Sequence, residues 1–373
     1  VIEPLFLDDL YAELELAGNS NKKLTMLLGR LYRIRIFDPA CGSGNFLVIA
    51  YKELCKLEIE VFKRLKQKQL SQSLKYIKLT HFFGIELDDF AHETAKLSLW
   101  LAEHQMNLSF KEAFGITRPT LPLQDGGHII CDNAMQLDWD EVCPKNEGFD
   151  IYIIGNPPYL GARMQSKQQK ADIAMVFDGI EGHKNLDYIS GWLMKGAEFI
   201  KNTKLQLAFV TTNSICQGEQ VAILWPHIFS KGLEIIFAHQ SFKWTNNAKS
   251  NAGVTCVVVG VSSKSTTGKK LFHEGICKSV ENINAYLIEG SNSTIVRKRA
   301  KPLSNLSLMT KGNMPYDGGN FSLTTSDKDS LIDKFPESRQ FVKRLLGARE
   351  FIHGLERWCI WIPDNKEQVA LSI

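Results

Sequence analysis

Short apolar runs alternate with longer stretches of mixed polarity through most of the chain. The runs are rich in β-branched and aromatic residues and are bounded by Gly, Pro or polar residues, as is typical of buried strands. The runs that we expect to form strands are Ile34–Phe37, His81–Glu86, Gly127–Cys131, Phe149–Gly155, Leu205–Thr211, Leu233–Ala238 and Gly253–Val261. Their alternation with helical stretches predicts an α/β fold built on a doubly wound sheet.

Helices are expected over a lead-in at residues 1–35 and at Asn45–Gln69 and Asp89–Met106. In the last of these, the apolar residues expected to pack on the sheet are Leu97, Trp100 and Leu101. The segment Leu160–Lys184 is polar and rich in Gln and Lys. A connection of that length is uncommon in a compact domain, so it predicts either a functional segment that closes over a substrate or a disordered one.

The pattern changes near residue 290. Residues 291–373 are irregular, with a helix expected at Thr325–Phe335 and an apolar, aromatic stretch at Phe341–Trp361. We therefore expect two domains, a doubly wound domain over residues 1–290 and a partial α+β extension over residues 291–373.

Composition indicates a globular protein with a large core, since 44% of the 373 residues are hydrophobic. No apolar run is long enough to span a bilayer, and we expect a soluble cytoplasmic protein. The eight Cys form no Cys-X-X-Cys pair and the nine His no His-Glu-X-X-His motif. Neither a disulfide framework nor a bound metal is therefore expected.

Charge is distributed unevenly. Residues 1–240 carry 25 basic and 29 acidic residues, a net charge of −4, whereas residues 241–373 carry 19 and 12, a net charge of +7. The densest basic cluster consists of Arg297, Lys298, Arg299 and Lys301. The positive charge of residues 241–373 indicates an anionic partner for this part of the chain. The basic cluster is also compatible with a solvated linker.

A Gly-rich turn joins the first strand to the first long helix. Leu47 stands where the dinucleotide fingerprint has its third Gly, and no Lys-Ser or Lys-Thr follows as in a P-loop. Asp38 ahead of the turn would repel a phosphate but would attract a cationic or amine-bearing ligand such as S-adenosyl-methionine. The residues of the turn that we expect at this cofactor are Asp38, Pro39, Ala40, Cys41, Gly42, Gly44, Asn45 and Phe46. Cys41 is interpreted as a small residue in a crowded loop rather than as a nucleophile.

The next two strands also end in polar residues. Glu86 follows the second strand, where an acid typically accepts hydrogen bonds from ribose hydroxyls. Asp132 and Asn133 follow the third and are candidates for reading the adenine edge of the cofactor.

The tetrapeptide Asn156-Pro157-Pro158-Tyr159 ends the fourth strand. Two prolines cannot continue a sheet ladder, so Asn156 must lie at the carboxyl edge of the sheet, where ligands bind. The Asn156 amide oxygen and the Pro157 carbonyl can accept both hydrogens of an exocyclic amino group, while the Tyr159 ring stacks on the planar system that carries it. By itself, the tetrapeptide is equally compatible with a Pro-rich turn that follows a strand and has no role in binding.

Taken together and in this order, these motifs resemble motifs I to IV of the N6-adenine DNA methyltransferases with the gamma motif order. Further segments resemble the MmeI-like single-chain restriction-modification enzymes. These segments are Pro4–Leu10, Asn45–Tyr51, Asn185–Tyr188, Thr211–Gln220 and Phe237–Trp244. The resemblance covers most of residues 1–262 and continues more faintly to the end.

The resemblance implies a Rossmann-like S-adenosyl-methionine-dependent methyltransferase that acts on N6 of adenine in double-stranded DNA, in a restriction-modification system. Asn156 to Tyr159 would be catalytic. The extruded base would stack between Tyr159 and Trp244, with Phe242 as the second candidate. Leu160–Lys184 would close over that base or track DNA, and the basic cluster would contact phosphates.

It also implies that residues 291–373 begin a target-recognition module that breaks off early. A fused or associated nuclease and the first cofactor motif of the family are expected to be missing from this chain. Three other functions stay open: methylation of a protein glutamine or of RNA, an inactive DNA-binding scaffold, and a Rossmann-type oxidoreductase.

Overall fold

The computed structural model describes residues 1–65, 77–116, 127–146, 148–243, 254–264, 268–299, 301–302, 304–307 and 317–373. By its contacts the chain divides into two compact units, Val1–Lys298 and Arg299–Ile373. None of the described helices is long and apolar enough to cross a lipid bilayer.

A nine-stranded sheet in the order β3-β2-β1-β4-β5-β7-β6-β8-β9 forms the centre of the first unit. Its strands are β1 (Ile34–Asp38), β2 (Phe82–Glu86), β3 (His128–Cys131), β4 (Asp150–Gly155), β5 (Gln206–Thr212), β6 (Leu233–Lys243), β7 (Thr255–Ser263), β8 (Lys269–His273) and β9 (Ile276–Val280). The pairs from β3 to β5 are all parallel, and β7 is antiparallel to both β5 and β6. This confirms the predicted doubly wound α/β sheet.

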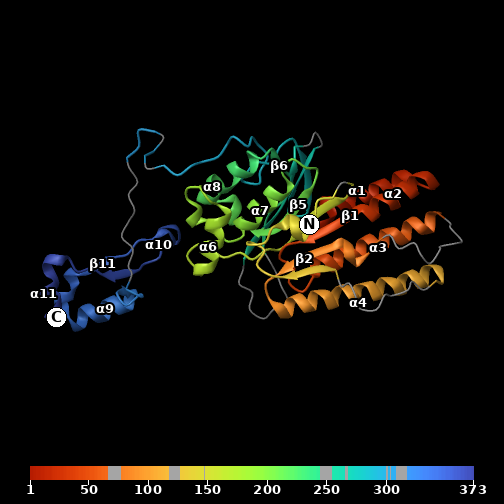
Figure 1. Cartoon of the computed structure of the whole chain (residues 1–373). Helices are drawn as coiled ribbons and strands as arrows, with labels where there is room; N and C mark the ends of the chain where they lie inside the picture. The colour runs from red at the N-terminus through yellow and green to blue at the C-terminus, as the bar shows by residue number, and fades with distance from the viewer. Residues whose placement is uncertain are drawn as a thin grey trace. The chain divides into compact units, whose positions relative to one another are not determined.

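Successive strand residues point to opposite faces and enter two separate cores. In β1, Ile36 belongs to the core under the early helices and Phe37 to the core under the later ones. The early helices, red to orange in Figure 1, are α1 (Asp8–Ala17), α2 (Asn21–Arg33), α3 (Asn45–Leu65) and α4 (Asp89–Phe114). The later ones are α5 (Trp139–Val142), α6 (Lys167–Val176), α7 (Ser190–Ile200) and α8 (Gly218–Phe229). Helices therefore cover both faces, as parallel strands require.

Single-turn helices complete the first unit. They are a π-helical turn at Glu3–Leu7 and 3₁₀ turns at Leu79–His81, His183–Asn185 and Asn213–Cys216.

The second unit is built on a small antiparallel sheet in the order β10-β12-β11. Its elements are β10 (Ser322–Leu323), α9 (Thr325–Lys334), a 3₁₀ turn at Pro336–Gln340, β11 (Val342–Arg344), α10 (Ala348–His353), β12 (Trp358–Ile360), a 3₁₀ turn at Asp364–Lys366 and α11 (Glu367–Leu371). Helix α9 confirms the helix expected near Thr325. Thr324 caps it, and Asp327 completes a capping box.

The predicted face of α4 was wrong. Leu97 and Leu101 are 52% and 54% exposed, and Trp100 is only partly buried against the core. The face that packs on the sheet carries Ala95, Leu99, Ala102, Met106 and Phe110, with His92 and Asn107. Small and polar residues obscure this face in the sequence, while large apolar residues lie on the exposed side.

Candidate active site

The carboxyl ends of β1, β2 and β4 meet at one edge of the sheet, as parallel strands dictate. Asp38, Glu86 and Asn156 stand at or directly after these ends. Strand order reverses between β1 and β4, because the chain runs outward to β2 and β3 on one side and to β5 on the other. Such a reversal opens a crevice where ligands bind.

Asp38 is fully buried at this reversal point. One carboxylate oxygen, Oδ1, accepts a hydrogen bond from the backbone N–H of Ala40 at 3.0 Å, whereas Oδ2 has no hydrogen-bond partner among the described residues. Burial, with a further contribution from the Glu86 carboxylate, raises the pKa of Asp38 to about 8. A cationic ligand that reaches Oδ2 would provide the missing partner and the compensating charge.

Gly155 is required for the close approach of β4 to this carboxyl group. A Cβ atom at Gly155 would lie 2.6 Å from Oδ1 of Asp38, well inside van der Waals contact. Any side chain at this position would displace the carboxyl group.

The Gly-rich turn is held against β2 by hydrogen bonds. Gly42, with φ +53°, donates its N–H to Oε2 of Glu86 at 2.7 Å. The other oxygen of Glu86, Oε1, accepts from the N–H groups of Leu87 (2.9 Å) and Asp88 (3.0 Å). Glu86 therefore fixes the turn as well as facing the crevice.

Cys41 is buried in the same turn, and its N–H donates to the carbonyl of Ile85 at 3.0 Å. Burial and then the charges of Asp38 and Glu86 raise the pKa of its thiol. A thiol that stays protonated is a poor nucleophile, in agreement with the structural role expected for Cys41.

A cavity of about 660 Å³ opens beside Glu86. The predicted residues that line it are Pro39, Ala40, Glu86, Asp132, Asn133 and Pro158. Asp132 adjoins β2 directly, since its N–H donates to the carbonyl of Glu86 at 2.9 Å. The structure thus brings the ends of the first three strands and the Pro-rich turn around one cavity.

Helix α6 forms another wall of this cavity, through Ser166, Gln168, Gln169 and Asp172. The segment Leu160–Lys184 therefore contains a regular helix in place of the long connection that the polar composition predicted. The sequence does contain a signal for the start of this helix, because Ser166 and Gln169 have the spacing of a capping box and form one in the structure.

Asp172 was not identified from the sequence. Its carboxylate accepts hydrogen bonds from Asn133 Nδ2 (3.1 Å), Gln136 Nε2 (3.0 Å), Gln168 Nε2 (3.2 Å) and Tyr188 OH (2.8 Å). Burial opposes ionisation, but these hydrogen bonds outweigh it and lower the pKa of Asp172. Asp172 is thus an ionised buried anchor that fixes Asn133 at the cavity.

The residues of the Pro-rich turn differ in their exposure to solvent. Pro157 is buried, Asn156 is half-buried and Tyr159 is 38% exposed. Among the described residues, none forms a hydrogen bond with the side-chain amide of Asn156. A buried carboxylate, Asp187, fixes the following residue by accepting the N–H of Leu160 at 2.8 Å. The turn is therefore rigid at its base while its amide is available to a ligand.

Phe242 and Trp244 are the two candidates for the opposite stacking face. Phe242 is the penultimate residue of β6 and is 37% exposed at the same sheet edge. Strands β5 and β7 lie between β4 and β6, which separates the two by about 14 Å at ordinary strand spacing. This spacing applies to the strands and not to Tyr159, which lies four residues beyond the end of β4, so the pairing of Phe242 with Tyr159 stays a prediction. Trp244 lies outside the described residues.

The basic cluster is exposed on the surface at the junction of the two units. Arg297 and Lys298 belong to the first unit, and Arg299 and Lys301 to the second. Lys298 pairs with Glu219 at 2.7 Å.

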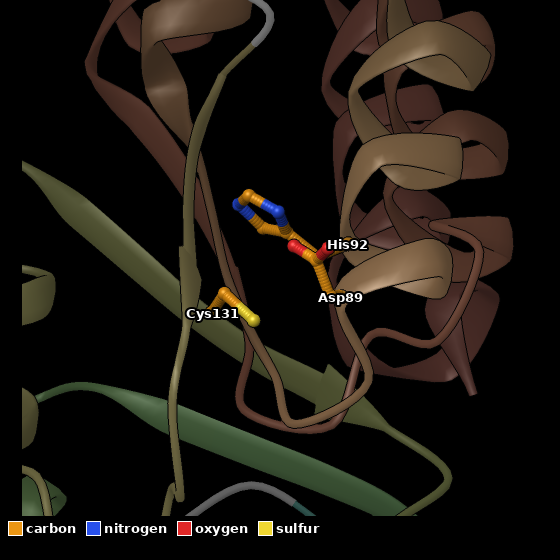
Figure 2. Close-up of side chains that lie close together, drawn as sticks. All are labelled: Asp89, His92 and Cys131. Atoms are coloured by element: carbon orange, nitrogen blue, oxygen red, sulfur yellow. The ribbon is translucent and has the colours of Figure 1, made fainter.

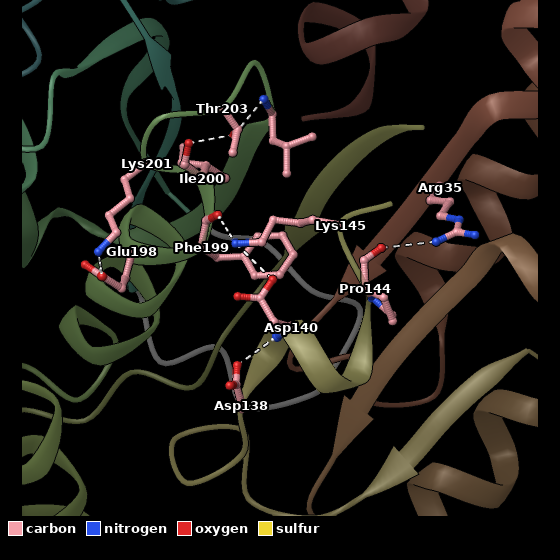
Figure 3. Close-up of polar contacts among 11 residues, drawn as sticks. Arg35, Asp138, Asp140, Pro144, Lys145, Glu198, Phe199, Ile200, Lys201 and Thr203 are labelled. Atoms are coloured by element: carbon pink, nitrogen blue, oxygen red, sulfur yellow. Dashed lines mark hydrogen bonds and ion pairs between the residues drawn. The ribbon is translucent and has the colours of Figure 1, made fainter. Parts of the chain in front are cut away.

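A second hollow, of about 780 Å³, lies near α5 and α7. Figure 3 shows its charged groups paired with one another. Lys145 contacts Asp140 (2.9 Å) and the carbonyl of Phe199 (3.0 Å), and Lys231 pairs with Glu198 (2.7 Å). These contacts brace the later helices, and among the described residues that line the hollow no buried polar atom lacks a partner.

The sheet order, the antiparallel β7 and the strand-end motifs define the class: this is a methyltransferase domain of the doubly wound α/β type. A family model for the DNA-methyltransferase domain of MmeI matches residues 14–273, and one for the target recognition domain of MmeI matches residues 290–373. The chain therefore belongs to the MmeI family of DNA methyltransferases of the restriction-modification type.

Two relatives extend over the whole chain. DNA methyltransferase A of Bacillus subtilis (strain 168) is 47% identical over 376 residues, which cover 100% of this chain and 42% of that protein. The structure of the type IIL restriction-modification enzyme MmeI in complex with DNA is 40% identical, with a TM-score of 0.92 over 97% of this chain and 50% of that one. The chain thus spans half or less of the length of these relatives.

Proposed function

We propose that this protein transfers the methyl group of S-adenosyl-methionine to N6 of adenine in double-stranded DNA, as the modification activity of a restriction-modification system. The observation that carries the proposal is the juxtaposition of Asp38, at the end of β1, with Asn156-Pro157-Pro158-Tyr159, at the end of β4, in a chain of the MmeI family.

The residues at the crevice fit the cofactor. The unpaired, buried Oδ2 of Asp38 suits its positive charges, and positive φ at Gly42 and Gly44 lets the backbone approach closely. Glu86 accepts hydrogen bonds from three N–H groups. Its carboxylate still has a lone pair that can accept a hydrogen bond from a ribose hydroxyl. Asp132 and Asn133 would face the adenine ring, and the remaining turn residues that we assign here are Pro39, Ala40, Cys41, Asn45 and Phe46. When bound, S-adenosyl-methionine supplies an electrophilic methyl carbon on its sulfonium.

The Pro-rich turn would position the nucleophile. The N6 lone pair of adenine is delocalised into the ring, so N6 is a weak nucleophile. Hydrogen bonds to Asn156 Oδ1 and the Pro157 carbonyl would hold the amino group with its lone pair directed at the methyl carbon, and most of the catalysis would be positioning. Pro158 would stiffen the turn, and the Tyr159 ring would stack on the extruded base.

The extension supports a DNA substrate. Residues 290–373 match a target recognition domain, and the matched MmeI structure is a complex with DNA. Arg297, Lys298, Arg299 and Lys301 would contact phosphates, which position a protein on DNA without reading its sequence.

The test uses Asn156→Ala in the full-length protein. Because the amide acts on the reacting amino group, we expect loss of labelled methyl transfer to duplex DNA, with cofactor and DNA affinities nearly unchanged. Retained transfer would exclude the assigned role of Asn156. Label recovered in protein or RNA in place of DNA would favour the alternative substrates.

A further inference from the structure

Three side chains of metal-ligand type converge where α4 begins and β3 ends (Figure 2). Asp89 and His92 lie one helical turn apart in α4, and Cys131 is the last residue of β3. One ligand atom from each lies within 4.8 Å of the other two. We propose that this Asp89–His92–Cys131 cluster binds a divalent transition-metal ion of the zinc type.

His92 is the strongest observation. Its side chain is only 7% exposed, and Nε2 lies 3.1 Å from the carbonyl of Ile129. A carbonyl can only accept, so Nε2 carries a hydrogen, and in the neutral imidazole Nδ1 presents a lone pair. Nδ1 is buried without a hydrogen-bond partner. Metal-binding histidines are commonly oriented in this way, with the second ring nitrogen donating to a backbone carbonyl.

The charges around His92 also favour a cation. Oε1 of Glu93 lies 3.1 Å from Nδ1 but outside hydrogen-bond geometry. Asp88 and Asp89 begin α4, and Glu86 and Asp132 follow the adjacent strands. An oxygen facing a lone pair is unfavourable unless a positive charge lies between them, either a proton on Nδ1 or a metal ion that replaces it.

The ligand types identify the class of metal. An imidazole nitrogen, a thiolate and a carboxylate oxygen together are typical of zinc sites, and three protein ligands leave a fourth position for water or for Glu93. Tetrahedral bonds would bring the ligand atoms to about 3.5 Å from one another. Asp89 and Cys131 are exposed and can make this short movement.

The ion would clamp an edge of the sheet. Strand β3 is terminal in the strand order and, in the described part of the chain, pairs only with β2, so a bond from Cys131 to α4 would fix its free end. This proposal departs from the expectation that no metal binds. That expectation rested on motif spacing, which cannot register ligands brought together from two separate elements.

The test is a Co²⁺ titration of the untagged, chelator-treated full-length protein, with Cys131→Ser as the variant and Cys277→Ser, which removes another exposed cysteine, as the control. We expect a thiolate-to-cobalt charge-transfer band that saturates at one ion per chain, that Zn²⁺ abolishes and that persists in Cys277→Ser. The proposal is overturned if the parent protein shows no band or if Cys131→Ser keeps it.

A second variant tests the ligand Asp89, which is exposed, so its replacement does not disturb the core. Asp89→Asn should weaken Zn²⁺ binding by at least tenfold, and Zn²⁺ should raise the thermal unfolding midpoint of the parent protein but not that of Cys131→Ser. Equal midpoint shifts in both proteins would contradict the clamp. Neither readout depends on methyl transfer.

Discussion

At the scale of single residues, the candidate site rests on polar groups that the fold leaves incompletely paired. Asp38 is buried with one oxygen unsatisfied, and Asn156 offers an amide that no described residue engages. A buried unpaired atom such as Oδ2 of Asp38 costs folding free energy unless a ligand completes it, whereas water can satisfy the half-buried amide of Asn156 until a ligand displaces it. Both were identified from the sequence, because each follows an apolar strand directly.

The buried carboxyl group predicts how cofactor affinity depends on pH. With its pKa raised to about 8, Asp38 must lose a proton to pair with a cationic ligand. Affinity should therefore increase from pH 6 to pH 8, by up to about tenfold per pH unit. Calorimetry in buffers of different ionisation enthalpy should detect the released proton. Asp38→Asn should remove both effects, and equal affinities at pH 6 and pH 8 in the parent protein would exclude this role.

The same group affects the stability of the cofactor-free protein. The folded state retains a proton that the unfolded chain releases above its ordinary pKa of 3.8. The free energy of unfolding should therefore decrease as the pH rises from about 4 to about 8. Denaturant titration of the parent and Asp38→Asn proteins at several pH values measures this difference.

Asp172 predicts a second residue-scale effect. In Asp172→Ala, Asn133 and Tyr188 lose a buried acceptor, so we expect a loss of about 1–3 kcal/mol in stability and a weaker cofactor complex. Asp178→Ala is the control, since Asp178 is exposed on the same segment and its loss should change stability by no more than about 0.5 kcal/mol. If both variants bind the cofactor like the parent protein, Asp172 does not position Asn133.

At the scale of elements, the sequence predicted the strands of the sheet better than the helices that cover it. Strands β1 to β7 were recognised because each is an apolar run with clear ends. The sequence could not show that α6 lines the cavity beside Glu86, since this helix is short and rich in Gln and Lys. The buried face of α4 was misassigned, and β8 and β9 were not recognised as strands.

The close approach of β1 and β4 gives an element-scale prediction. In Gly155→Ala the new Cβ must displace Asp38, and we expect cofactor binding to weaken by about tenfold, or about 1.4 kcal/mol. Gly29→Ala is the control, because a Cβ there meets nothing within 4 Å and Ala stabilises a helix by up to about 1 kcal/mol. Isothermal titration of both variants separates a local clash from general destabilisation, and unchanged binding in Gly155→Ala would contradict the geometry.

At the scale of the whole molecule, residues 1–240 carry a net charge of −4 and residues 241–373 a net charge of +7. The change of charge sign was readable from the sequence. How the extension recognises a target was not, because recognition depends on side chains placed by the tertiary fold rather than by local pattern. The expected division at residues 290 and 291 stays a prediction beside the contact-based division at Lys298 and Arg299.

The basic cluster predicts a salt-dependent effect on DNA binding. Arg299→Ala or Lys301→Ala should weaken binding equally on all sequences and reduce the slope of log affinity against log salt by about 0.9 per lost phosphate contact. Lys56→Ala, which removes an exposed lysine of α3 paired with Glu53, should leave the slope unchanged. Fluorescence anisotropy at several salt concentrations measures the slopes, and unchanged slopes in the cluster variants would mean that these residues form a solvated linker.

The central claim is that the strand-end site methylates N6 of adenine in DNA. It is tested most directly by mapping modified bases in the genome of a host that lacks adenine methylation and expresses the full-length protein. We predict N6-methyladenine at one short sequence motif with the parent protein, and none with Asn156→Ala. Absence of N6-methyladenine in the parent genome, or its persistence with Asn156→Ala, would contradict the account.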